Sequence, residues 1–243
     1  MQYKMERIHK IIAANSKCSR REAEKKITDG RVCVNGTPAT IGQSARLGID
    51  VITVDGTVMT AVSKRIYLML NKPCGYLCAV KDKRGRKTVM ELVEDAEGFV
   101  FPVGRLDLNS KGLLLFTNDG EFANKIMHPS FNLQKTYEVK VTGNVDEAAV
   151  LLREPLEIDG YTVTAVSVKV NGKTINGGLL TITIAEGRNR QIRKMCCLCG
   201  LKVDSLKRIS IGNLKLGKLK NGHWRYLTDK EVLSFGEGYI KRN

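Results

Sequence analysis

The sequence of 243 residues lacks a long apolar segment, which limits where the protein can reside. No apolar run approaches the roughly 20 residues that a membrane-spanning helix needs. The first ten residues, MQYKMERIHK, also lack the apolar stretch of a signal peptide. Because 42% of the residues are hydrophobic, the chain can still bury a core. We therefore expect a folded cytoplasmic protein without a membrane partner.

Acidic residues are scarce relative to basic ones. The chain has 25 Asp and Glu against 40 Lys and Arg, a formal net charge of +15. From residue 185 onward there are 14 basic and 5 acidic residues. A folded chain this basic most often binds nucleic acid. An anionic membrane surface is less favoured, because no basic amphipathic helix carries Trp or Phe on its apolar face.

Motifs for cofactors and metals are missing as well. The sequence has no GxGxxG and no GxxxxGK[ST], so we expect no nucleotide cofactor and no use of ATP. Cys196 and Cys199 form a CxxC, but no second CxxC or HxxxH supplies the other ligands of a structural zinc ion. The seven cysteines are therefore best explained as small, reduced core residues. We expect no metal site.

Residues 1–58 read as a small separate unit. Ser19 and Glu22 fit a capping box that starts a helix running to about residue 29, with Gly30 at its end. The stretch RVCVNGTPA predicts a strand that enters a hairpin at Asn35-Gly36, and DVITVDG predicts another strand. The pattern indicates two helices followed by a small sheet.

Basic residues gather on and around this second helix. A solvated helix face is the simpler explanation, but in a chain with this net charge a phosphate-binding face is favoured. The residues expected to bind RNA are Lys17, Arg20, Arg21, Lys25, Lys26 and Arg31.

After a short linker at residues 59–65, the chain from 66 to 243 becomes rich in strands. Alternating or apolar stretches such as IYLMLNKP, GLLLFTNDG, KTYEVKVTG and LLTITIAEG predict strands, and DEAAVLLRE predicts a short helix. RNRQIRKMCCLCG predicts an amphipathic helix with an Arg-rich first turn. Together these elements predict an α+β fold with a mostly antiparallel sheet.

Three polar residues of this region are candidates for chemistry. Asp107 stands in GRLDLNSKGLLLF, directly before an apolar run, and a carboxylate is costly to bury without a partner. Tyr137 alone is more often a core tyrosine, and Arg193 alone is more often a surface or phosphate contact. Only their combination is informative.

The combination resembles a known family. GRLDLNSKGLLLFTNDG, KTYEVKV and EGRNRQIRKM occur in the order and spacing typical of the RsuA/RluB/RluE/RluF family of bacterial pseudouridine synthases, and SRREAEKKITDGRVCVNG resembles the S4 RNA-binding domain that precedes their catalytic domain. The likeness covers almost the whole chain. The stretches NRQIRKMC and LKRISIGNLKLGKL resemble the RluF branch most, which modifies 23S ribosomal RNA. Ser110 replaces a frequent Thr, and Ile8-His9 replaces a usual Leu-Asn pair.

The resemblance implies roles for individual residues. Asp107 matches the essential aspartate, Tyr137 the tyrosine that stacks on the target base and could act as general base, and Arg193 the basic residue paired with the aspartate. Such a pair would keep the carboxylate charged in a dry pocket lined by the apolar run. The expected substrate-binding residues are Arg105, Asn189, Arg190, Gln191 and Ile192.

Other functions compete with this interpretation. The same chemistry could act on small-subunit ribosomal RNA or a tRNA stem-loop. A non-catalytic S4-type assembly factor would explain the charge but not the second domain. A hydrolase of glycosidic bonds usually needs a second carboxylate, which the Asp107 motif lacks. We expect a monomer whose substrate is ribosomal RNA, with 23S RNA favoured.

Overall fold

The structure is a computed structural model, and it describes residues 5–16, 18–60 and 64–236. The chain forms two units: Met1–Arg65 together with Asn118–Gly120, and the remaining residues from 66 onward. Part of the expected linker, residues 61–63, lies outside the described residues, as does Lys17. No helix in the described ranges is long and apolar enough to cross a membrane.

The N-terminal unit contains the two predicted helices and small sheet. Helix α1 is Ile8–Asn15 and α2 is Arg20–Thr28. Ser19 caps α2 in a reciprocal capping box with Glu22, and Gly30 follows with φ +68°. Apolar residues of both helices and of the sheet share one core, which includes Ile8, Ile12, Ala23, Val32 and Ile52.

The strands of this unit are short. A four-stranded antiparallel sheet has the order β3-β2-β5-β6, and β1 pairs with β4. Their bounds are β1 Glu6–Arg7, β2 Val32–Val34, β3 Thr37–Pro38, β4 Ser44–Ala45, β5 Ile52–Val54 and β6 Thr57–Val58.

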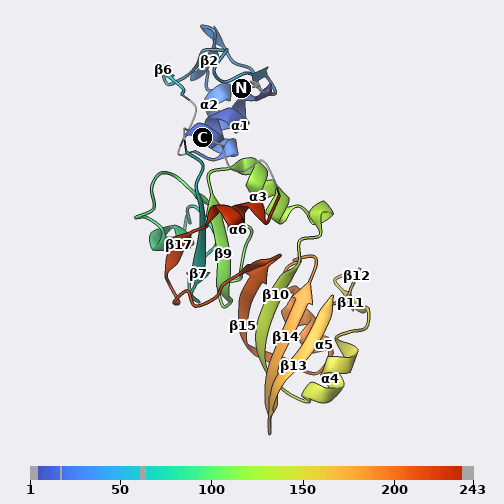
Figure 1. The fold of residues 1–243 in the computed structure, drawn as a ribbon. Coiled ribbons are helices and arrows are strands. Elements are labelled where there is room, and N and C mark those ends of the chain that lie inside the picture. Colours follow the sequence, from blue (N-terminus) through green and yellow to red (C-terminus); the bar gives the residue numbers. More distant parts are fainter. Residues whose placement is uncertain (1–4, 17, 61–63, 237–243) are drawn as a thin grey trace. The chain divides into compact units, whose positions relative to one another are not determined.

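The second unit is built on one large mixed sheet, as Figure 1 shows. Its order is β13-β14-β10-β15-β9-β7-β17, with β16 on β15 and β8 on β9. Every pair is antiparallel except β9 with β15, so two antiparallel halves meet at one parallel contact. The bounds are β7 Tyr67–Lys72, β8 Phe101–Val103, β9 Lys111–Thr117, β10 Lys135–Thr142, β13 Ser167–Thr174, β14 Gly177–Ile184, β15 Lys202–Ile211, β16 Leu214–Lys215 and β17 Trp224–Tyr226.

Helices cover both faces of this sheet. Apolar residues of α4 (Val145–Leu151) and α5 (Gln191–Leu198) pack on the face that carries Tyr137, Val139 and Leu206. Residues of α3 (Gly120–Met127) and α6 (Asp229–Leu233) pack on the other face. Smaller elements complete the unit: η1 Val89–Leu92, η2 Pro129–Phe131, β11 Leu156–Ile158 and β12 Tyr161–Val163. The predicted α+β class is confirmed.

One helix differs from its expected extent. Helix α5 begins at Gln191, so Arg188 and Arg190 precede it and do not form its first turn. Arg190 is its N-cap residue and adopts a left-handed conformation, with φ +52°. The turn therefore presents these arginines in a loop, and both are exposed to solvent.

Candidate active site

The loop that carries Asp107 is held in place by a buried lysine. Lys72, at the end of β7, has no solvent exposure. Its Nζ donates to the backbone oxygens of Ser110 (2.9 Å), Pro73 (3.0 Å) and Asp107 (3.3 Å). Burial lowers the pKa of Lys72, although Cys78, Cys74 and Asp107 nearby act in the opposite direction. A cation thus binds both ends of the turn that contains Asp107.

The segment after β7 holds the residues on either side of Asp107. The Leu106 amide donates to the Cys78 sulfur at 3.3 Å, and the Gly75 amide donates to the Leu108 carbonyl at 2.9 Å. The Ser110 amide closes the turn onto the Asp107 carbonyl at 3.0 Å. These bonds use the loop backbone, which leaves the half-buried Asp107 carboxylate available to a substrate.

Arg193 reaches the same loop from α5. Its guanidinium donates to the Asn109 carbonyl through Nη2 (3.0 Å) and to the Val203 carbonyl through Nη1 (3.3 Å). The ion pair that we expected between Arg193 and Asp107 is not formed, and no cation of the described residues lies within 4.0 Å of that carboxylate. Two of the guanidinium nitrogens, Nη1 and Nη2, donate to backbone carbonyls instead, and Nε is buried with no partner in the described part of the chain. Arg193 therefore positions the Asp107 loop.

The parallel contact in the sheet aligns three side chains of the candidate site. Lys72 is paired with Gly112, Gly112 with Arg208, and Arg208 with Tyr137. Residues paired across neighbouring strands point to the same face of a sheet. Lys72, Arg208 and Tyr137 therefore lie in one row, on the face covered by α5. A Cβ at Gly112 would lie 2.2 Å from the Arg208 carbonyl oxygen, so only glycine allows this approach.

Arg208 is a buried cation with a free donor. It is 5% exposed, and its Nε donates to the Leu113 carbonyl at 2.8 Å. Its Nη2 is buried and has no hydrogen-bond partner among the described residues. A buried donor without a partner is costly, so Arg208 is a candidate for a direct substrate contact.

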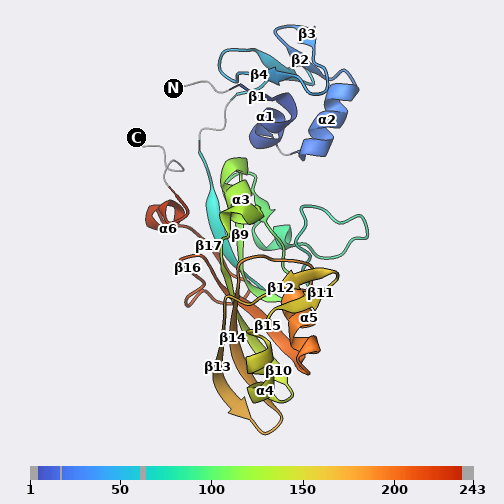
Figure 2. The same ribbon diagram turned by 90° about the vertical axis from the view of Figure 1, so that its right-hand side faces the viewer.

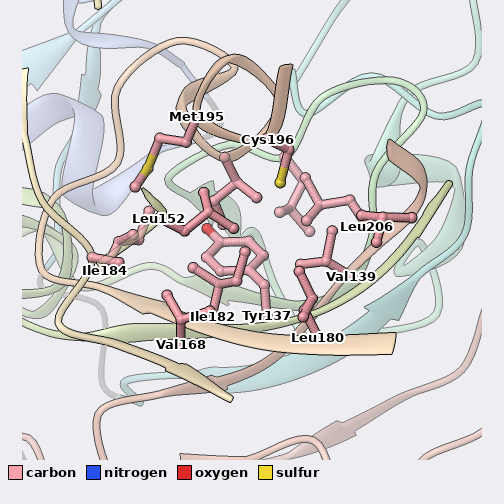
Figure 3. Close-up of a cluster of buried hydrophobic side chains, with 14 of the residues drawn as sticks. Tyr137, Val139, Leu152, Val168, Leu180, Ile182, Ile184, Met195, Cys196 and Leu206 are labelled. Carbon is pink, nitrogen blue, oxygen red and sulfur yellow. The ribbon is translucent and has the colours of Figure 1, made fainter. Parts of the chain in front are cut away.

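Tyr137 lies deeper in the core than a stacking residue alone requires. It is 7% exposed, and Figure 3 shows its ring among Val139, Ile182 and Leu206. Met195 and Cys196 of α5 belong to the same cluster. This packing fixes the orientation of the ring at the end of the row.

The apolar run after Asp107 does not form the dry pocket that we expected. Leu113 and Leu115 pack in the core on one face of the sheet, and Leu114 and Phe116 pack in the core on the other. All four side chains are fully buried, because β9 is a central strand with both faces covered. The run therefore stabilises the strand that carries the loop and does not line the carboxylate.

The predicted substrate-binding residues occupy different environments. Arg105 is exposed and has no ion-pair partner among the described residues. Asn189 and Arg190 are exposed in the turn before α5. Gln191 is 3% exposed and accepts from the Arg188 amide at 3.0 Å, while its Nε2 is buried without a partner. Ile192 is buried in the same core cluster as Tyr137. Their contacts with RNA stay predictions.

The basic face predicted on α2 is only partly free. Arg20, Arg21 and Lys25 are exposed. Lys26 and Arg31 instead both bind the Asp55 carboxylate, each at 2.5 Å. These two bonds lower the pKa of Asp55, with Lys26 the larger cause. Two of the predicted phosphate-binding cations thus share an acidic partner.

The cysteines and histidines show no grouping typical of a metal site. Within the described ranges, no three His, Cys, Asp or Glu side chains come together as ligands. Cys196 and Cys199 are buried, and burial raises the pKa of Cys196 to about 12. Its thiol therefore stays protonated at neutral pH and serves as a core residue.

Lys72 and Arg208 were missed in the sequence. Each continues the alternation of apolar residues on one strand face: Lys72 follows Leu68 and Leu70, and Arg208 follows Leu206. A charged residue at a strand position where the alternation predicts a buried side chain is the local signal that could have identified them.

An N-terminal unit of two helices and a small sheet, followed by a mixed sheet with a fixed aspartate loop, matches the class of RNA-modifying enzymes that the motifs suggested. The chain belongs to the RNA pseudouridylate synthase family, whose sequence profile matches residues 66–197, and the S4 domain profile matches residues 6–46. It is an RNA pseudouridine synthase, an isomerase that acts on RNA.

Individual relatives are similar over nearly their full length. The chain is 41% identical over 229 residues to an uncharacterized RNA pseudouridine synthase of Aquifex aeolicus, covering 93% of this chain and 92% of that protein. It is 39% identical over 231 residues to the ribosomal large subunit pseudouridine synthase B of Bacillus subtilis, covering 94% of each. A solved pseudouridylate synthase structure superposes with a TM-score of 0.65 at 28% identity, over 94% of this chain and 99% of that one. The finer assignment to the RluF branch stays a prediction.

Proposed function

We propose that this enzyme converts a specific uridine of 23S ribosomal RNA to pseudouridine. The support for a large-subunit substrate is the likeness to synthases named for it in Bacillus subtilis and Haemophilus influenzae, at 39% and 38% identity. The observation that carries the chemistry is the Asp107 loop, whose backbone is bound by Lys72 and Arg193 while its carboxylate has no ion-pair partner in the described part of the chain.

The reaction breaks the bond between N1 of uracil and C1′ of the ribose, turns the base, and rejoins it through C5. Nothing is oxidised and no phosphate is consumed, so the step needs neither a redox cofactor nor ATP. It does need an anion beside the sugar and the base. In our proposal Asp107 is that anion, through attack, charge stabilisation or removal of a sugar proton.

Tyr137 and Arg193 complete the proposed site. The Tyr137 ring stacks on the uracil, and its hydroxyl oxygen takes up the C5 proton while its own proton passes to water. Arg193 keeps the Asp107 loop in position through Asn109, as its hydrogen bond at 3.0 Å supports. Arg105, Asn189, Arg190 and Gln191 bind the nucleotides that flank the target.

The target uridine must leave its stack to reach Asp107. Unstacking costs a few kcal/mol and least in a loop or bulge, so the proposed target lies in such an element. The exposed cations of the S4 unit bind neighbouring phosphates. We also propose that the protein is monomeric and cytoplasmic.

The test is tritium release from RNA that contains 5-tritiated uridine. Ribosomal RNA from cells without this protein is incubated with the wild type or with Asp107→Asn, which keeps the side-chain shape and removes the charge. We expect release by the wild type from large-subunit RNA, and a loss of at least about 1,000-fold in the variant.

Other outcomes assign the other functions. Release from small-subunit RNA or from tRNA alone would replace the substrate, and free uracil as a product would indicate a hydrolase. RNA binding without release from any of the three would indicate an assembly factor.

A further inference from the structure

A strongly basic loop lies in the catalytic unit, between Cys78 and the 3₁₀ helix η1. We call residues 79–87 the basic loop. Figure 2 shows it as the long teal segment that projects from the sheet. It has a single acidic residue, Asp82, and its five basic side chains are exposed: Lys81, Lys83, Arg84, Arg86 and Lys87.

One carboxylate gives the basic loop a defined shape. Asp82 accepts hydrogen bonds from the backbone amides of Arg84 (3.1 Å) and Arg86 (3.0 Å). It also accepts from Nε (3.1 Å) and Nη2 (2.7 Å) of Arg86. These bonds lower the pKa of Asp82 to about 2, so the carboxylate stays ionised at neutral pH.

The remaining cations of the basic loop are uncompensated. Asp82 neutralises Arg86, and Lys87 lies 5.9 Å from the centre of the Tyr76 ring. Lys81, Lys83 and Arg84 have no ion-pair partner within the described part of the chain. Three free positive charges are therefore displayed on a shaped loop.

The base of the loop is joined to the Asp107 loop. Leu77 closes the neck, since its amide donates to the Lys87 carbonyl and its carbonyl accepts from the Val89 amide, both at 2.9 Å. The adjacent Cys78 accepts from the Leu106 amide, and Gly75 donates to the Leu108 carbonyl. The neck is thus hydrogen-bonded to the residues immediately before and after Asp107.

We propose that the basic loop binds backbone phosphates of the substrate RNA beside the target uridine, a role that rests on the proposed function of the enzyme. Phosphates suit it because lysine and arginine bind them without a partner surface of defined shape. A protein or membrane partner is less suited, because Val80 is the one large apolar side chain that the loop exposes. The loop thereby orients the RNA backbone at the place where the base leaves its stack.

The test compares two double variants that each remove two positive charges. Lys83→Ala/Arg84→Ala changes the tip of the basic loop. Lys140→Ala/Lys169→Ala is the matched control, since both lysines are exposed on the sheet face opposite to Tyr137. Tritium release is measured against RNA concentration and salt, and the Kd of an RNA fragment is measured for each variant in the Asp107→Asn background.

We expect kcat/KM of the loop variant to fall at least about 10-fold at 0.15 M salt (roughly physiological), with kcat changed less than about 2-fold. The slope of log Kd against log salt should decrease by about 1.4, as for two lost contacts to single-stranded phosphates. The control should stay within about 2-fold of the wild type.

Two results overturn the proposal: equal effects of the two double variants, or a loss in kcat with Kd and salt slope unchanged. Failure of the proposed function looks different, because the wild type then releases no tritium. The binding measurement still tests the loop in that case. Thermal unfolding of each variant confirms that an effect does not come from misfolding.

Discussion

The cations around the Asp107 loop and the paired cations of the S4 unit are held in opposite ways. In the catalytic unit, Lys72, Arg193 and Arg208 donate to backbone carbonyls. In the S4 unit, Lys26 and Arg31 donate to a carboxylate, that of Asp55. A carbonyl satisfies donors but leaves the charge of the cation in place, whereas a carboxylate cancels it.

The difference shows what each arrangement is suited for. Burying a cation against carbonyls is costly for folding, because its charge loses water and gains no opposite charge. We expect a protein to bury cations in this way only where a positive potential is useful. Here that place is the Asp107 loop and the row from Lys72 to Tyr137. The ion-paired cations of the S4 unit are exposed or half-buried, cost little, and contribute less to the field.

The largest effect is expected where the two halves of the sheet meet. In Gly112→Ala the new Cβ would lie 2.2 Å from the Arg208 carbonyl oxygen and 2.7 Å from its nitrogen, at φ +105°. We expect the free energy of unfolding in urea to fall by about 3 kcal/mol or more. Gly85→Ala in the basic loop is the control, since φ is +69° but nothing lies within 4 Å, and about 1 kcal/mol is expected. Equal losses would show that the close approach at Gly112 is not required.

The next test removes one cation that is bound by carbonyls, Lys72, and one that is paired with a carboxylate, Lys26. Lys72→Met removes the lysine donor from three carbonyls, of which that of Asp107 keeps the Ser110 amide, and we expect a loss of about 2 kcal/mol in unfolding free energy. Tritium release should fall about 100-fold, because the Asp107 loop shifts. Lys26→Met should change stability by less than about 1 kcal/mol. A Lys72→Met protein as stable and active as Lys26→Met would remove the contrast between the two units.

The difference in stability between the wild type and Lys72→Met should depend on pH, and the sign of this dependence is known. Because burial lowers the pKa of Lys72, the unfolded chain binds the proton more tightly than the folded one. Wild-type stability relative to Lys72→Met should therefore increase as pH rises from the lowered pKa toward the ordinary value of 10.5. Urea unfolding of both proteins across alkaline pH measures the difference, which a constant gap would contradict.

An intermediate effect is expected at Arg208. Arg208→Lys keeps a positive charge but loses the planar group whose Nε binds Leu113 and whose Nη2 is free. If Arg208 contacts the flipped base and not distant phosphates, kcat should fall about 10- to 30-fold with KM changed less than 3-fold. Arg225→Lys, at an ion pair with Glu231, is the control and should keep its activity. A change in KM alone would assign Arg208 to RNA binding.

The sequence could predict these features unevenly. Local patterns sufficed for the capping box at Ser19 and for strands such as β9 and β10, and a motif made Asp107 the candidate catalytic residue, which stays a prediction. Lys72 and Arg208 escaped because their importance depends on the pairing of β7, β9, β15 and β10, and the parallel pair has no local pattern. The expected Arg193–Asp107 pair failed for a related reason: sequence order cannot show that backbone carbonyls already bind Nη1 and Nη2 of the guanidinium.

The smallest effect is expected when the carboxylate partner of the paired cations in the S4 unit is removed. Asp55→Asn removes the charge that Lys26 and Arg31 share, and Asn tolerates the left-handed conformation of this turn, φ +53°. With both cations released, RNA should bind about 2- to 3-fold more tightly at low salt and equally at high salt. In the wild type the pairs weaken only in acid, since the pKa of Asp55 is lowered and the stabilisation is lost as pH falls through it. Weaker binding by Asp55→Asn would mean that the carboxylate orients the two cations for RNA, and that both units use fixed cations after all.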